Sequence, residues 1–164
     1  MKKIVLAYSG GLDTSYCIKY LTADKGYEVH ALTVDTGGFS DEEIVEMEAR
    51  AKSLGAASYK RVDVTGAYYK ECIRYLVYGN CLRYQTYPMS VSAEWMFLAM
   101  SVARYAVEID ADGVAHGSTG AGNDQVRFDL AFELSGKELE IITPIRDMQL
   151  SRQEEVDYLA KHGL

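Results

Sequence analysis

The sequence contains few of the features that mark secreted, disulfide-bonded or membrane-spanning chains. It has only three cysteines, an odd number without a C-x-x-C pair, so neither a disulfide framework nor a zinc site is expected. No stretch approaches the roughly 18 consecutive apolar residues that a membrane helix needs. No basic and apolar leader opens the chain, so we expect a cytoplasmic protein with reduced thiols. Cys17 is expected to be buried in a helix and to take no part in chemistry.

An excess of positive charge is also lacking, since acidic residues outnumber basic ones and the formal net charge is -7. Negative charge opposes binding to a polyanion, so neither nucleic acid nor a membrane is an expected partner. The chain has only two prolines, and 48% of its 164 residues are hydrophobic, as is usual for a globular domain. We find no internal repeat or linker and expect residues 1–164 to form one domain.

Strand-like segments alternate with helical ones along the chain. The expected strands cover residues 3–8, 27–34, 57–63, 112–116 and 139–143. This order is typical of an α/β fold, a doubly wound and mainly parallel sheet with helices on both faces. The capping-box spacing of Ser40 with Glu43, and of Ser151 with Glu154, predicts the starts of two helices, the first of which stops at Gly55.

Tyrosine is abundant, with 13 residues in the chain. Several lie close together in the sequence, at Tyr68, Tyr69, Tyr75 and Tyr78. A large ring stabilises a core more often than it stacks on a nucleic-acid base. We therefore expect these tyrosines to pack a helix against the sheet.

The most informative segment is the turn from Ser9 to Ser15, Ser-Gly-Gly-Leu-Asp-Thr-Ser, between the first expected strand and a helical pattern. Its adjacent glycines let backbone N–H groups approach an anion, and the helix start adds unpaired donors and a favourable dipole. Hydroxyl groups of Ser9, Thr14 and Ser15 add further donors. The segment has no lysine, so it is not a Walker loop, and the G-x-G-x-x-G fingerprint of dinucleotide sites is absent as well. It predicts a site for nucleotide phosphates.

Polar residues follow two other expected strands. Asp35 comes at the end of the second strand, and Gly37 and Gly38 would let the chain turn over an adenosine, with Val34 near the base. An ordinary strand-to-helix loop explains Asp35 equally well. His116 follows a buried strand and is expected to be a hydrogen-bonded structural histidine rather than a proton carrier.

A second glycine-rich segment spans residues 116–128. Asn123 and Arg127 are four residues apart, on one face if a helix starts near Gly122, and Asp124 is beside them. A carboxylate and a guanidinium in one site suit an amino acid, whose ammonium and carboxylate groups need opposite partners. The alternative is a capped helix start with an internal ion pair.

The first segment resembles the pyrophosphate loop S-G-G-x-D-[ST]-S of the N-type ATP pyrophosphatases. Residues 7–15, 116–120 and 122–128 together resemble argininosuccinate synthase. The resemblance covers essentially the whole chain and implies an adenine nucleotide alpha hydrolase-like fold. Chains of that family are more than twice as long, so the resemblance implies that the C-terminal synthetase domain is absent from this chain.

The resemblance implies an ATP-dependent ligase of arginine biosynthesis. In that reaction the ureido oxygen of citrulline attacks the α-phosphorus of ATP and releases pyrophosphate, and the amino group of aspartate then displaces AMP. Mg²⁺ would bridge pyrophosphate oxygens, with Asp13 near the metal or the phosphates and no protein ligand of the metal assigned. The full-length enzyme would be a homotetramer, and the isolated domain is expected to be inactive.

The resemblance also implies binding residues at matching positions. ATP would be bound by Ala7, Tyr8, Ser9, Gly10, Gly11, Leu12, Asp13, Thr14, Ser15, Val34 and Gly117. Among these, Asp13 is the catalytic candidate. Aspartate would be bound by Thr119, Asn123 and Asp124. Citrulline would be bound by Tyr87, Ser92, Asn123 and Arg127.

Two positions depart from the family's pattern. Ala121 stands where many members have a lysine, so a positive charge near the phosphates is missing. Glu94 or Trp95, depending on the register, stands where the family has an arginine. We hypothesise a modified citrulline pocket that takes an N-acylated citrulline, which lacks the free ammonium.

Two other functions would share the first segment. A tRNA-modifying ATP pyrophosphatase would need a basic surface or paired catalytic cysteines, and the sequence shows neither. A non-catalytic adenine-nucleotide-binding module would explain the fold but would leave residues 119–127 without a role.

Overall fold

Five parallel strands form the centre of the structure. The computed structural model describes residues 1–120, 123–134 and 138–164, except for the side chain of Asp124. In spatial order, the strands are β3 (Ser58–Asp63), β2 (Glu28–Asp35), β1 (Lys3–Ala7), β6 (Gly113–Ala115) and β7 (Glu140–Ile142). All four pairings are parallel. The five predicted strands are confirmed, with each boundary within one residue.

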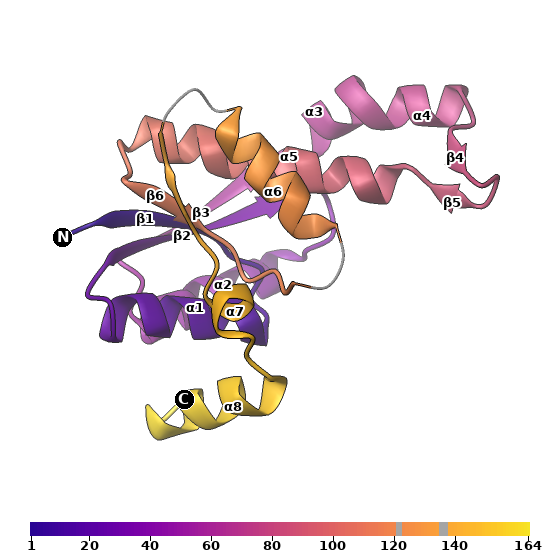
Figure 1. Ribbon diagram of the computed structural model, residues 1–164. Coiled ribbons are helices and arrows are strands. Elements are labelled where there is room, and N and C mark those ends of the chain that lie inside the picture. The colour runs from indigo at the N-terminus through magenta and orange to yellow at the C-terminus, as the bar shows by residue number, and fades with distance from the viewer. Residues whose placement is uncertain (121–122, 135–137) are drawn as a thin grey trace.

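Helices cover both faces of this sheet (Figure 1). One face is covered by α1 (Leu12–Ala23), α2 (Asp41–Leu54) and α7 (Pro144–Met148), with α8 (Arg152–Lys161) packed on α1. The other face is covered by α5 (Ser90–Glu108) and α6 (Asp124–Glu133). The arrangement confirms the predicted doubly wound α/β class. Within the described ranges, no helix is long and apolar enough to cross a bilayer.

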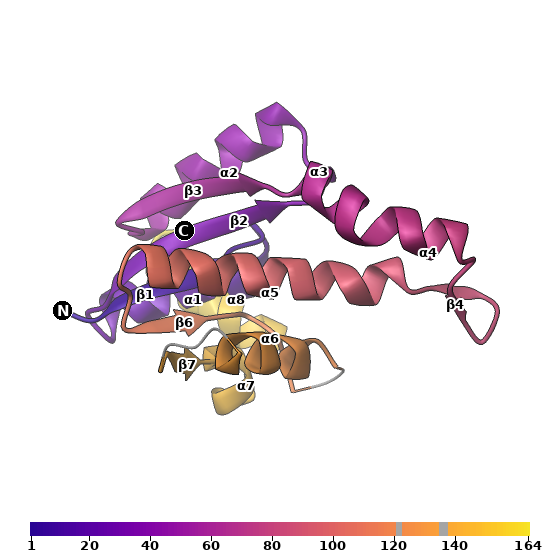
Figure 2. The same cartoon turned by 90° about the horizontal axis from the view of Figure 1, so that it is seen from above.

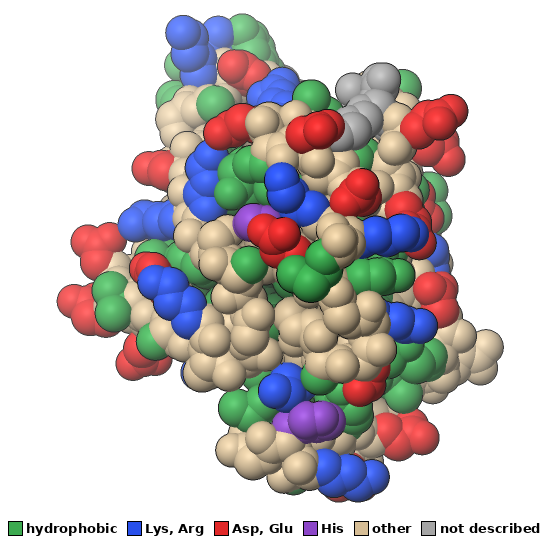
Figure 3. All heavy atoms as spheres, turned by 90° about the vertical axis from the view of Figure 1, so that its left-hand side faces the viewer, with side chains coloured by type: hydrophobic (Ala, Val, Ile, Leu, Met, Phe, Trp, Pro, Cys, Tyr) green, Lys and Arg blue, Asp and Glu red, His purple; other side chains and the backbone are tan. Residues whose placement is uncertain are grey.

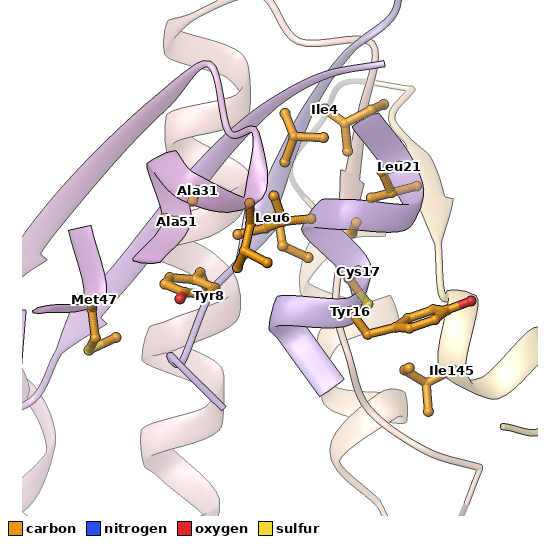
Figure 4. Packing of buried hydrophobic residues seen from close by; sticks show 14 of the residues in the cluster. Ile4, Leu6, Tyr8, Tyr16, Cys17, Leu21, Ala31, Met47, Ala51 and Ile145 are labelled. Atoms are coloured by element: carbon orange, nitrogen blue, oxygen red, sulfur yellow. The ribbon is translucent and has the colours of Figure 1, made fainter. Parts of the chain in front are cut away.

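The central strand β1 shows why both faces are covered. Ile4 and Leu6 belong to the cluster beneath α1 and α2, whereas Val5 between them belongs to the cluster beneath α5 and α6. Alternate side chains of a strand point to opposite faces, and all three are fully buried. Figure 4 shows Ile4 and Leu6 near Leu21 of α1. Cys17 is buried in the same cluster, and this burial raises the pKa of its thiol, which keeps the group protonated.

Both predicted capping boxes are confirmed. The Glu43 N–H donates to Ser40 Oγ at 3.2 Å, and the Ser40 N–H donates to Glu43 Oε2 at 2.8 Å. Ser151 and Glu154 make the same reciprocal pair at the start of α8. Gly55 ends α2 in the left-handed conformation with φ 106°. Short local motifs therefore set the positions of these helix ends.

The segment that follows β3 differs from the sequence prediction. It contains α3 (Thr65–Tyr68), the π-helical turn η1 (Tyr69–Ile73), α4 (Arg74–Tyr78) and a hairpin of β4 (Leu82–Arg83) with β5 (Tyr87–Pro88). We call it the arm, because it extends away from the sheet (Figure 2). The ring of Tyr68 is buried and packs against Phe97 of α5, a helix that itself covers the sheet. The prediction is wrong for Tyr69, Tyr75 and Tyr78, whose side chains are exposed on the arm.

The amino-terminal edge of the sheet carries exposed ion pairs. Lys2 Nζ lies 2.5 Å from Glu140 Oε2, and Lys60 Nζ lies 3.2 Å from Glu108 Oε1. Figure 3 faces this side and shows acidic and basic side chains interspersed over it. Solvent screens exposed ion pairs of this kind, so this edge adds little to stability. The predicted nucleotide segments lie at the opposite edge.

Candidate functional site

The sheet reverses its winding at β1. From this strand the chain continues to β2 and β3 on one side, whereas β6 and β7 lie on the other. At such a reversal, the loops after two neighbouring strands turn apart and leave a crevice at the carboxyl ends of the strands. Here they are the loops after β1 and β6, which contain the two glycine-rich segments.

The loop after β1 has the shape of an anion cradle. Gly10 has φ 75°, and a Cβ there would come within 2.9 Å of a side chain of α2, so the position requires glycine. The Thr14 hydroxyl donates to the Gly11 carbonyl at 3.3 Å and lies 3.2 Å from Ser9 Oγ. Arg50 of α2 donates to the Gly10 carbonyl at 2.8 Å. Arg50 thus holds the backbone of the loop through its carbonyl group, and the hydroxyl groups of Ser9 and Thr14 lie beside the start of α1.

The loop after β6 packs directly against this cradle. A Cβ on Gly117 would lie 3.2 Å from Asp13 Cβ and 3.2 Å from Thr14 Cγ2. A side chain at this position would push the two loops apart by a few tenths of an ångström, so glycine allows their close approach. Segments that the sequence predicts separately are therefore neighbours in the structure.

A cavity of about 520 Å³ opens between these loops. Its volume is within the range of small-molecule sites. Of the residues predicted to bind ATP, all but Gly10 and Ser15 line it, namely Ala7, Tyr8, Ser9, Gly11, Leu12, Asp13, Thr14, Val34 and Gly117. Ser15 is buried within α1 instead.

The lining combines apolar walls with polar groups. The apolar side chains include Leu32, Val34, Phe39, Trp95, Leu98, Val102 and Phe128. The polar ones are Ser9, Asp13, Thr14, Thr33, Thr36, Glu94, His116, Ser118, Thr119 and Arg152. The Trp95 and Phe128 rings meet edge to face, with centroids 5.7 Å apart. An aromatic base needs apolar walls and a phosphate needs hydrogen-bond donors, so the cavity offers surroundings for both.

His116 lines the cavity but is held as a structural group. Its Nδ1 accepts a hydrogen bond from the Ser118 N–H at 3.2 Å, and its ring stacks on Phe128 with centroids 4.8 Å apart. Burial lowers the pKa of His116, and the Asp129 carboxylate 3.6 Å from Nε2 acts in the opposite direction without offsetting it. A neutral imidazole at neutral pH agrees with the expected structural role.

Asp35 is not among the cavity-lining residues. It is buried, and its Oδ1 accepts a hydrogen bond from the Gly37 N–H at 2.7 Å. Its Oδ2 accepts hydrogen bonds from Arg61 Nη2 at 2.6 Å and Nε at 3.0 Å. Both oxygens are therefore engaged in holding the turn after β2, which favours the ordinary-loop interpretation of this residue.

Replacing Arg61 with methionine should lower the free energy of unfolding by about 1.5 kcal/mol, because it leaves the buried Asp35 carboxylate without its cation. The full cost of a buried unpaired charge is not expected, since a third of the Arg61 side chain is exposed. Urea denaturation monitored by circular dichroism measures the change. Lys60→Met on the same strand is the control, because its ion pair with Glu108 is exposed and should contribute under about 0.5 kcal/mol. Equal losses in the two variants would contradict the expectation.

The predicted amino-acid-binding residues are brought together only in part. Thr119 lines the cavity, and Asn123 is exposed at the start of α6. Arg127 Nη2 donates to Ser92 Oγ at 3.2 Å, which joins two of the citrulline candidates across α5 and α6. Tyr87 lies on β5 of the arm (Figure 1), and it is not among the cavity-lining residues. The side chain of Asp124 and the whole of Ala121 lie outside the described residues.

Several lining residues were not predicted as ligands of the nucleotide. Phe39 follows β2, and Arg152 begins α8 within the Ser151–Glu154 capping box, a motif that predicts a helix start and no ligand. Glu94 and Trp95 were noted only as departures from the family's pattern. Thr36 Oγ1 donates to Glu94 Oε1 at 2.6 Å, which connects the end of β2 to α5 across the cavity. Of these four residues, only Glu94 and Trp95 are marked by a signal in the sequence.

Comparisons of the whole chain agree with the geometry. The family described as "Arginosuccinate synthase N-terminal HUP domain" matches residues 3–164. Argininosuccinate synthase of Methanocaldococcus jannaschii is 42% identical over 160 residues, which cover 98% of this chain and 40% of that protein. The enzyme of Staphylococcus saprophyticus is 39% identical over 163 residues, which cover 99% of this chain and 40% of that protein. The chain thus spans about 40% of the length of these curated relatives.

Two solved structures share the fold. A predicted subunit of tRNA methyltransferase from Methanocaldococcus jannaschii has a TM-score of 0.62 at 16% identity, covering 98% of this chain and 76% of that one. NMN synthetase from Francisella tularensis has a TM-score of 0.56 at 12% identity, covering 96% of this chain and 76% of that one. These likenesses show the fold alone. The family match over nearly the whole chain goes further: the chain belongs to the argininosuccinate synthase family.

Proposed function

We propose that this chain is the ATP-binding domain of a cytoplasmic ligase that joins citrulline to aspartate and forms argininosuccinate, AMP and pyrophosphate in arginine biosynthesis. The observation that carries the proposal is the close packing of the two glycine-rich loops around one cavity, at the carboxyl ends of β1 and β6. The relatives are longer than this chain, and we propose that their remaining part forms a further domain that completes the site and builds the homotetramer. The domain alone is proposed to bind ATP without turnover.

The adenine base would lie among the apolar walls, with the phosphates at the loop after β1. The N–H groups at the start of α1 and the hydroxyls of Ser9 and Thr14 would donate to phosphate oxygens. Among the described residues, no group of three or more His, Cys, Asp or Glu could hold a metal ion. Mg²⁺ commonly binds substrate phosphates together with water and one or two carboxylates, and we propose that it enters with the nucleotide. When bound, Mg²⁺ would offset phosphate charge, and Asp13 is the cavity carboxylate at the start of α1.

The chemistry would depend on placement rather than on a covalent enzyme intermediate. Thr119, Asn123 and Asp124 would bind aspartate. Tyr87, Ser92, Asn123 and Arg127 would bind citrulline, and the contact of Ser92 with Arg127 supports the pairing of these two.

Glu94 and Trp95 both line the cavity, which supports a citrulline pocket modified to take an N-acylated citrulline. The full-length protein with ATP and aspartate tests this by comparing turnover of citrulline with that of N-acetylcitrulline. If the protein turns over free citrulline and refuses the acylated form, the modified pocket is excluded. Refusal of both, with intact ATP binding, would exclude the ligase.

Thr14→Val should weaken Mg-ATP binding by about tenfold, because valine keeps the shape of threonine but cannot donate to a charged phosphate oxygen. Isothermal titration calorimetry on the 164-residue chain measures the change. Thr22→Val is the matched control on the same helix, because the Thr22 hydroxyl donates to the Ile18 carbonyl at 2.8 Å and does not line the cavity. Similar affinities for the two variants would count against the proposed phosphate position.

A further inference from the structure

The cavity has little positive charge for a nucleotide site. Asp13 and Glu94 both line it, whereas Arg152 is the only lysine or arginine in the described lining. A triphosphate brings several negative charges, and burying them requires cations or charge-assisted hydrogen bonds. Arg50 contacts the loop after β1, but it does not line the cavity and its guanidinium donates to the Gly10 carbonyl. Besides the Mg²⁺ and the N–H donors proposed above, Arg152 is therefore the one cationic side chain that the described lining offers to the phosphates.

Contacts along α8 hold Arg152 in place. Ser151 caps the helix start, so Arg152 is its first residue. Farther along α8, the centroid of the Tyr158 ring lies 4.8 Å from that of the Tyr16 ring in α1. The Tyr158 hydroxyl donates to Asp24 Oδ2 at 2.9 Å. These contacts fix α8 against α1 and leave the first turn of α8 beside the cavity.

The burial of Glu155 shows that the first turn of α8 faces the start of α1, where Asp13 lies. Glu155 lies three residues after Arg152, on the same side of the helix, and is only 3% exposed. Burial and the neighbouring Asp13 carboxylate raise the pKa of Glu155, whereas Arg152 lowers it. Glu155 therefore lies within electrostatic reach of both residues. Arg152 itself is exposed and makes no hydrogen bond or ion pair with the part of the chain that the structure describes.

We propose that the Arg152 guanidinium binds the phosphates of the nucleotide and is a binding residue that α8 contributes to the site. Arg152 has this role only if ATP is the ligand of the cavity, as proposed above. A guanidinium can donate two parallel N–H bonds to phosphate oxygens, which are stronger than bonds between neutral groups. Its exposure lets the side chain adjust to the ligand without disturbing the core.

The test compares Mg-ATP and adenosine binding in the 164-residue chain and in Arg152→Gln, Arg152→Lys and Lys161→Gln. We expect Arg152→Gln to weaken Mg-ATP binding about tenfold and to leave adenosine binding within about twofold, because adenosine has no phosphate. Arg152→Lys keeps the charge and should recover part of the affinity. Lys161→Gln removes a charge from the other end of α8 and should bind as the unchanged chain does.

Binding of Mg-ATP by Arg152→Gln within twofold of the unchanged chain would overturn the role of Arg152 and leave the proposed ATP site standing. Parallel loss of ATP and adenosine affinity would also overturn it, because it would show a structural effect. Failure of the unchanged chain to bind ATP would overturn both proposals. Raising the salt concentration should reduce the difference between Arg152→Gln and the unchanged chain, since screening weakens the charge of Arg152.

Discussion

Replacing Gly113 with alanine is expected to lower the free energy of unfolding by about 3 kcal/mol. Gly113 lies in β6, between β1 and β7. A Cβ there would lie 2.6 Å from the Glu140 carbonyl oxygen and 3.1 Å from Ile4 Cδ1. The first of these contacts is with the backbone of a paired strand, so no flexible side chain can move aside, and the pairing of β6 with β7 must open.

Urea denaturation measures the effect, with Gly66→Ala as the matched control. A Cβ on Gly66 of α3 would meet nothing within 4 Å. That substitution should change stability by less than about 1 kcal/mol, since alanine favours a helix. Similar stability of the two variants would mean that β7 can move without cost. Gly113→Ala should also weaken ATP binding, because β6 positions the loop that contains Gly117.

The second large effect is a loss of stability as the pH rises from about 4.5 to about 7, caused by Glu155. Burial, followed by the neighbouring Asp13 carboxylate, raises the pKa of Glu155 from 4.5 to about 7. A folded-state pKa above the unfolded value means that the fold binds the proton more tightly. The resulting stabilisation is complete below pH 4.5 and is lost as the pH rises through 7, by about 3 kcal/mol in all.

Glu155→Gln removes this titration, so its free energy of unfolding relative to the unchanged chain should rise by about 3 kcal/mol between pH 4.5 and pH 8. Taking the difference also removes the contribution of His116, whose lowered pKa makes the fold less stable as the pH falls below 6.5. Glu154→Gln is the control, because hydrogen bonds from Ser151 lower the pKa of Glu154 and the residue stays charged above pH 5. A flat difference for Glu155→Gln would show that the carboxyl group finds water or a cation.

The parts of the fold that the sequence predicts are those set by neighbouring residues. The strands follow from short apolar runs, and the starts of α2 and α8 follow from reciprocal Ser–Glu caps that span four residues. The glycine-rich loops are predictable for the same reason, because Gly10 and Gly117 are needed for backbone shape and close approach. Their meeting at one cavity follows from the parallel sheet, which brings the carboxyl ends of β1 and β6 to the same edge.

The remaining parts depend on contacts between distant elements. Arg152 reaches the cavity only because α8 packs on α1, and no local pattern encodes that contact. Tyr68 is buried and Tyr78 is 84% exposed, although both lie in similar tyrosine-rich sequence. A helix can bury a face against the sheet only if it runs alongside the sheet. Here α4 continues outward along the arm, so its tyrosines have no sheet to pack on. Tyr87 is carried away from the cavity for the same reason.

The central place of β1 also bears on the order of events during synthesis. One of its two neighbours, β2, follows within the first 35 residues. The other, β6, comes much later, and contacts on that side span long stretches of chain. The hydrogen bond from the Lys3 N–H to Asp112, for example, joins residues 109 positions apart. Until β6 has left the ribosome, β1 presents an unpaired apolar edge, which is the kind of surface that promotes aggregation. A nascent chain that stalls before residue 113 should therefore depend on chaperones, and ATP cannot shorten that interval because the loop after β6 does not yet exist.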